Sequence, residues 1–158
     1  MQEISDQADK DIDATGADTV DKVNSIRDKA INDISNVKAT ADDNEQKELE
    51  QTKENNKASV DDLVKAAKKR VQDAYDKLGK DEKVLAASDY NKAMADITQA
   101  QATANDAISA AANADAIVKA VSTASTAFDA AATTAEVAFA RVTAKTAIQA
   151  EADKVKKV

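Results

Sequence analysis

The stretch that decides the fold is residues 98–150, TQAQATANDAISAAANADAIVKAVSTASTAFDAAATTAEVAFARVTAKTAIQA, in which 21 residues are alanine and seven are charged. It lies within residues 81–158, which contain neither Gly nor Pro. Because alanine has the highest helix propensity and both strong helix breakers are absent, this stretch is predicted to be helical. It has few large side chains and few charges, so it is not expected to be stable alone in water and needs partner helices.

The first eighty residues are predicted to supply those partners. Over residues 3–38, apolar side chains recur at intervals of three and four, which is the period of one helix face; they are Ile4, Ala8, Ile12, Val20, Val23, Ala30, Ile34 and Val37. Gly16 interrupts this pattern and costs about 1 kcal/mol relative to alanine. We therefore also consider a helix that begins near Asp18, with residues 1–15 frayed.

A second helix is predicted over residues 42–78. Thr40 is placed to cap its first free amide groups, and Asp42 and Asp43 would complement the positive end of the helix dipole. Its expected inner face comprises Leu49, Asn56, Val60, Leu63, Val64, Ala67, Val71, Ala74 and Leu78. Gly79 occupies the position that favours a left-handed residue after a helix, and Asp81 is expected to cap the next one.

The third helical tract is predicted over residues 81–157, with a possible break within residues 112–135. The break is expected either at Asn113-Ala114-Asp115 or at Thr133-Thr134-Ala135-Glu136, a capping-box pattern. The tract carries an apolar stripe made of Val84, Tyr90, Met94, Ile97, Ala104, Ile108, Ala111, Val118, Val121, Phe128, Ala135, Phe139 and Val142. The predicted fold is thus all-α, an elongated antiparallel bundle of three or four long helices, forming a single module over residues 1–158.

Composition argues against several classes of function. The chain has no Cys and no His, so it has no thiolate nucleophile, imidazole base or thiolate metal site. Its net charge of −7 argues against a general nucleic-acid binder. A narrow alanine-lined bundle also leaves little room for a ligand, and no carboxylate falls on the apolar stripes. We therefore expect no enzymatic activity, no catalytic residue and no cofactor.

A weak calcium-loop pattern lies near the N-terminus. Asp9, Asp11 and Asp13 alternate as loop ligands would, but the sixth position is Ala14 and the twelfth is Val20. A calcium loop needs Gly and a bidentate Glu at those positions. Gly16 comes two residues late, so a solvated acidic helix end is the favoured interpretation and no metal site is predicted.

Two further groups of side chains could form a binding surface or could be ordinary solvated side chains. The only basic cluster comprises Lys65, Lys68, Lys69 and Arg70, but flanking aspartates cancel most of its field. Threonines at positions 123, 126, 133, 134, 143 and 146 could form an ordered hydroxyl array, but their spacing is too irregular to stay on one face. We interpret the threonines as small residues that let helices approach closely.

Three segments carry a family resemblance. They are KAINDI at residues 29–34, KAMADI at residues 92–97 and NDAI at residues 105–108. These segments, and the proline-free texture between them over residues 18–112, resemble the helical repeats of giant extracellular-matrix-binding surface proteins and related adhesin stalks of Gram-positive bacteria. That resemblance implies a mechanical spacer or adhesive rod outside the cell and carries no catalytic residue. The sequence departs from the family in having no sorting motif, signal peptide or clean tandem repeat.

The function predicted from the sequence is a non-enzymatic spacer or adhesive module of a bacterial surface protein. Its expected partners are neighbouring modules or extracellular protein ligands, with self-association through residues 112–158. The location implied by the resemblance is the cell surface, for a fragment of a longer chain; a cytoplasmic protein is the alternative. Two other functions stay open, an amphipathic bundle that binds lipid surfaces and a stress-protection helical protein.

Overall fold

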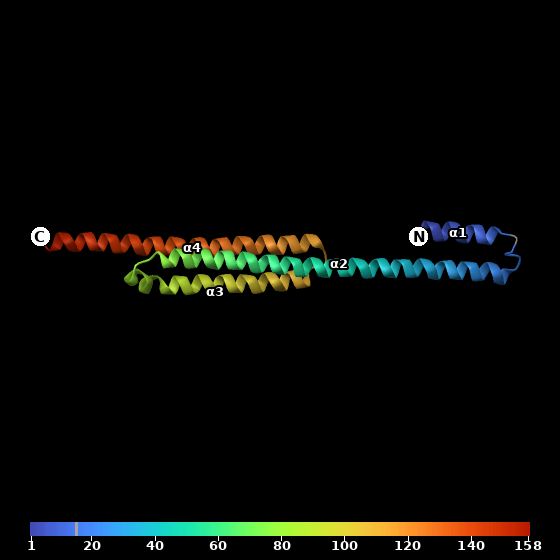
Figure 1. The fold of residues 1–158 in the computed structure, drawn as a ribbon, viewed down its shortest axis with the longest axis horizontal. Helices are drawn as coiled ribbons and strands as arrows, with labels where there is room; N and C mark the ends of the chain where they lie inside the picture. Colours follow the sequence, from blue (N-terminus) through green and yellow to red (C-terminus); the bar gives the residue numbers. More distant parts are fainter. Residues whose placement is uncertain (15) are drawn as a thin grey trace. The chain divides into compact units, whose positions relative to one another are not determined.

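The computed structural model describes residues 1–14 and 16–158, and it is an all-α protein (Figure 1). Its helices are α1 (Gln2–Asp13), α2 (Val20–Asp76), α3 (Lys80–Ala110) and α4 (Ala114–Lys156). The chain divides into two compact units, Met1–Glu50 and Gln51–Val158, and α2 contributes to both. That residues 1–158 act as a single module stays a prediction.

The second unit is a three-helix bundle made by residues 51–76 of α2, by α3 and by α4. Each helix contributes small and β-branched side chains to one core, as expected for helices that pack side by side. The largest fully buried side chains are Ile97, Ile108, Ile117, Val60 and Val71. Alanines line the rest of the core, and Phe128 and Phe139 are both buried as the sequence predicted. Two residues of the predicted α3–α4 stripe, Val84 and Val118, are instead exposed.

The first unit contains α1 and the N-terminal part of α2. The two helices are joined by residues 14–19, so the single helix predicted over residues 3–38 is wrong, and the break lies where Gly16 interrupts the apolar pattern. Residues 2–13 form a helix where fraying was also considered; Thr15 lies outside the described residues. α2 begins at Val20, close to the start considered near Asp18, and the Thr19 hydroxyl accepts a hydrogen bond from the Lys22 amide at 3.2 Å, as an N-cap does.

The predicted boundary between residues 38 and 42 is wrong, because α2 runs through it without interruption. The Thr40 hydroxyl donates to the Asn36 carbonyl at 3.0 Å, so it acts as a mid-helix side chain and caps nothing. Asp42 and Asp43 pair with lysines four residues away, Lys38 and Lys47, instead of facing a helix start.

The turn predicted at residues 78–80 is confirmed, but its chemistry differs from the prediction. Gly79 has φ −65° and ψ 165°, an extended conformation, and it is the N-cap of α3. The Glu82 carboxylate accepts a hydrogen bond from the Gly79 amide at 2.8 Å. Glu82, and not Asp81, therefore satisfies the free amide at this end.

The break in the third tract lies at residues 111–113, the first of the two predicted places. Asn113 is the N-cap of α4, and its side-chain oxygen accepts a hydrogen bond from the Ala116 amide at 2.9 Å. The second place, residues 133–136, is inside α4, so that alternative is wrong. There Glu136 and the Thr133 hydroxyl both bind Arg70, and the capping box does not form.

Replacing Asn113 with alanine removes this cap. We expect the free energy of unfolding of the bundle to fall by about 1 kcal/mol, because the Ala116 amide loses its acceptor. Asn113→Asp keeps an acceptor and is the matched control, expected to unfold at nearly the same urea concentration as the unchanged protein. Equal unfolding midpoints for the alanine variant and the unchanged protein contradict this role.

Candidate interaction surfaces

An alanine-lined groove of about 700 Å³ runs between α3 and α4. Its walls are Ala100, Ala104, Ala107 and Ala110 of α3, Ala111 just after that helix, and Ala116, Ala120, Ala124 and Ala127 of α4. Asp96 and Lys119 are its only charged lining residues. Such a surface offers close backbone approach and apolar contact, and its one carboxylate, Asp96, is paired with Lys92 on its own helix.

Arg70 joins α2 to α4 across the bundle surface. Its guanidinium makes a two-pronged pair with Glu136, with both N–O distances at 2.6 Å. It also donates to Asp129 at 2.6 Å and to the Thr133 hydroxyl at 2.9 Å. The prediction that Arg70 belongs to a solvated basic cluster is wrong. Lys65 and Lys69 pair with Asp62 and Asp73 on their own helix, whereas Arg70 binds another helix.

The Arg70 pair makes an acid-sensitive contribution to stability. The hydrogen bond from Arg70 lowers the pKa of Glu136 from its ordinary value of 4.5. A carboxyl with a lower pKa in the folded state stabilises the fold above pH 4.5, and this contribution is lost as the pH falls through the lowered value. Glu136→Gln should therefore cost about 0.5–1 kcal/mol at pH 7, a figure reduced for solvent screening, and the difference should shrink toward pH 3.

Urea unfolding at pH 7 and pH 3 checks this expectation. Glu151→Gln is the control, because Glu151 pairs with Lys154 on its own helix and both side chains are exposed. A Glu136→Gln difference that stays constant between pH 7 and pH 3 contradicts the proposed coupling to Arg70.

Tyrosines and a buried lysine tie the three helices together. Tyr75 of α2 lies 4.4 Å from Tyr90 of α3 and 5.6 Å from Phe139 of α4, measured between ring centroids. The Tyr75 hydroxyl donates to the Lys83 carbonyl at 2.8 Å, and the Tyr90 hydroxyl binds Gln72.

Lys53 is 8% exposed, and its ammonium donates to the Ser109 carbonyl at 3.1 Å, next to the C-terminus of α3. A cation there complements the negative end of the helix dipole. We interpret the tyrosine and Lys53 contacts as interactions that hold the helices of the bundle together.

The calcium-like pattern is part of α1, so Asp9, Asp11 and Asp13 are helical and form no loop. Residues two apart on a helix are rotated by about 200°, so these carboxylates cannot all face one ion. Within the part of the chain that the structure describes, no group of three or more His, Cys, Asp or Glu side chains could hold a metal.

The interpretation of the threonines as small residues between closely packed helices is wrong. Five of its six members are exposed, and Thr146 is half-buried. Thr126 donates to the Ser122 carbonyl of its own helix. The close approach of helices in this region belongs to the buried alanines, such as Ala124 and Ala132.

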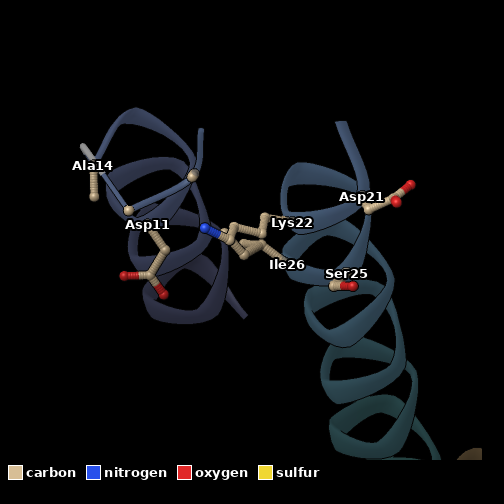
Figure 2. A pocket seen from close by; sticks show the side chains of 8 residues that line it. Asp11, Ala14, Asp21, Lys22, Ser25 and Ile26 are labelled. Atoms are coloured by element: carbon tan, nitrogen blue, oxygen red, sulfur yellow. The ribbon is translucent and has the colours of Figure 1, made fainter. Parts of the chain in front are cut away.

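A surface pocket of about 440 Å³ lies in the N-terminal unit, between the end of α1 and the start of α2 (Figure 2). The Lys22 side chain extends from α2 toward α1 beside Ile26, with Asp11 on the facing helix. The Lys22 ammonium is paired with Asp18 at 2.5 Å, so it is already neutralised locally. The charged groups of this pocket are the carboxylates of Asp11 and Asp21 and the paired Lys22 ammonium. We interpret the pocket as a polar junction between the two helices.

Each described helix is too short or too polar to span a lipid bilayer. Comparison of this chain with protein families, with curated proteins and with solved structures finds no match.

Proposed function

We propose that this chain is a non-enzymatic spacer or adhesive module of a bacterial surface protein. The observation that carries the proposal is the length of α2, which continues for 57 residues; its part in the first unit, residues 20–50, alone extends about 45 Å. An uninterrupted helix of that length gives reach, which is the property a spacer requires.

The segments KAINDI at residues 29–34 and KAMADI at residues 92–97 support the proposal, because they have the same local structure. In each, a lysine pairs with an aspartate four residues later: Lys29 with Asp33 at 2.5 Å, and Lys92 with Asp96 at 2.6 Å. In each, an isoleucine follows the pair: Ile97 is buried and Ile34 is half-buried. Repetition of one helical segment in both units is typical of chains built from similar modules.

The spacer role is tested by placing the full chain between a cell-wall anchor and a terminal epitope on a bacterial surface. Deletion of residues 35–52 removes 18 residues, which are five helical turns, so α2 keeps its phase and shortens by about 27 Å. Antibody binding to the epitope should fall in the shortened version at equal expression. Equal antibody binding by both versions overturns the spacer role.

The surface location is tested separately by treating intact cells of the source organism with protease. The proposal expects digestion of the chain while a cytoplasmic marker stays intact. Digestion only after lysis rules out the surface role.

A further inference from the structure

The N-terminal unit is a two-helix hairpin whose apolar seam is open. α1 and the start of α2 line a groove of about 280 Å³, with Ile4 and Ala8 on one side and Ile26 and Ala30 on the other. None of the described residues among positions 1–50 is fully buried. The seam therefore keeps apolar surface in contact with water, which is unfavourable in proportion to its area.

The repeated segment indicates what is missing from this seam. In the bundle, Ala93 and Ile97 are 4% and 0% exposed, because α3 packs against two other helices. The corresponding residues of the hairpin, Ala30 and Ile34, are only half-buried. The same segment thus has one neighbouring helix in the hairpin and two in the bundle, so the hairpin lacks a third helix.

The C-terminal end of α4 is a helix with an uncovered apolar face. Ala144, Ile148, Ala152 and Val155 recur at intervals of four, four and three, so they share one face. Ile148 and Val155 are each 70% exposed. This face is rotated by about 200° from the face of Val142 and Thr146, which continues the bundle-facing stripe. It is therefore a separate surface that the bundle does not use.

The two surfaces have opposite charge. Residues 1–50 contain 14 acidic and 6 basic side chains, whereas residues 144–156 contain 3 basic and 2 acidic ones. Of these three lysines, Lys154 and Lys156 pair with Glu151 and Asp153 on their own helix. Glu3, Asp11 and Asp33 line the hairpin groove, with Lys29 as its one basic residue, and Lys29 is already paired with Asp33. A basic amphipathic helix fits an apolar groove with acidic edges.

We propose that residues 144–156 of one copy dock into the hairpin groove of a second copy and act as its third helix. This inference does not rest on the proposed surface role. The interface joins two different surfaces, so association continues head to tail instead of closing as a symmetric dimer. A single short helix buries a small area, so the dissociation constant is expected on the order of 100 μM.

Sedimentation equilibrium of the full chain from about 1 μM to 1 mM is the first test. The average mass should rise with concentration without a plateau at the dimer, and added salt should weaken the rise, because the surfaces carry opposite charge. The double variant Ile148→Asp, Val155→Asp should weaken association at least about tenfold. The control is Val84→Asp, Val118→Asp, which changes two valines that are 74% and 63% exposed outside both surfaces and should leave association unchanged.

A mixing experiment tests the head-to-tail geometry. Ala8→Arg, Ala30→Arg blocks the groove and leaves the C-terminal helix free, whereas the Ile148→Asp, Val155→Asp variant has the reverse defect. Each variant alone should stay monomeric, and their mixture should form a 1:1 complex that grows no further. If circular dichroism shows that the arginine variant has lost helix, Glu3→Lys, Asp11→Lys replaces it; both side chains are exposed, so this variant blocks by charge alone.

Three results overturn the proposal. One is self-association that survives the Ile148→Asp, Val155→Asp change. Another is an average mass that does not depend on concentration. The third is binding of the unchanged chain to vesicles of anionic phospholipid, abolished by the same variant, without self-association; that result makes the C-terminal helix a membrane-surface helix instead.

Discussion

Replacement of Ile97 with alanine will lower the free energy of unfolding of the C-terminal bundle by about 2–5 kcal/mol. Ile97 is 0% exposed and is among the largest fully buried side chains of the described chain. Its removal takes away apolar contact and leaves a cavity that neighbouring alanines are too short to fill. In a core with so few large side chains, this loss is a considerable fraction of a typical total stability of about 5–15 kcal/mol.

The matched control is Val84→Ala on the same helix, at a side chain that is 74% exposed. Its effect is expected to stay within about 0.5 kcal/mol, because nothing packs against an exposed valine and alanine favours helix. Urea unfolding followed by circular dichroism measures both variants. Similar losses from Ile97→Ala and Val84→Ala contradict the packing described for α3.

Replacement of Ala41 with proline will break α2 in its middle, at a cost of about 3 kcal/mol or more to the local helix. Position 41 lies inside the continuous helix, so proline removes an amide hydrogen bond and clashes with the carbonyl of Val37. If a helix began at Thr40, proline at position 41 would be the first helical residue, where it is tolerated. Hydrogen exchange of the amides around position 41 should therefore accelerate strongly in the variant.

Thr40→Ala distinguishes a continuous α2 from a helix that starts at Thr40, because its effect on helix stability has opposite signs in the two structures. As an N-cap, Thr40 would stabilise the helix and its loss would cost about 1 kcal/mol. As the mid-helix residue seen here, it is a poorer helix former than alanine, so Thr40→Ala should slow hydrogen exchange slightly. If hydrogen exchange is faster in Thr40→Ala and changes little in Ala41→Pro, α2 is not continuous and the boundary predicted between residues 38 and 42 is right.

Local sequence patterns found some helix ends and misplaced others, for a physical reason. Asn113 and Thr133 both begin patterns that can start a helix, but only Asn113 does so. Asn is a better N-cap and a poorer mid-helix residue than Thr, whose hydroxyl can donate to the carbonyl four residues earlier. Thr40 does this, and Thr133 binds Arg70. A threonine-based start pattern inside a proline-free, alanine-rich stretch is therefore weak evidence for a boundary.

Local sequence patterns could not predict which side chains join one helix to another. Arg70 binds Glu136 and Asp129, which lie 66 and 59 positions away in the chain. Periodicity predicts which face of a helix is apolar, but it does not say which helix will cover that face. The available signal was chemical: Arg70 is the one arginine among lysines in its cluster, and arginine favours two-pronged pairing with carboxylates.

The open hairpin groove was likewise not foreseen from the sequence. The stripe from Ile4 to Ile34 predicts a buried face, yet Val20 is exposed and the other members are only half-buried, because only one other helix lies beside them. An apolar pattern indicates that a face is suited to burial, and the number of neighbouring helices decides how far burial proceeds. This difference between pattern and burial is the basis of the docking proposal.

The most direct measurement of the central claim, that α2 is one uninterrupted helix through residues 38–42, is the distance between spin labels on either side. The chain has no Cys, so Asp28→Cys and Gln46→Cys create the only two labelling sites. They are 18 residues apart, which is five full turns, so both labels project from the same face. A continuous helix predicts a narrow distribution centred near about 27 Å. A broad distribution, or one centred well below that value, contradicts the continuous helix.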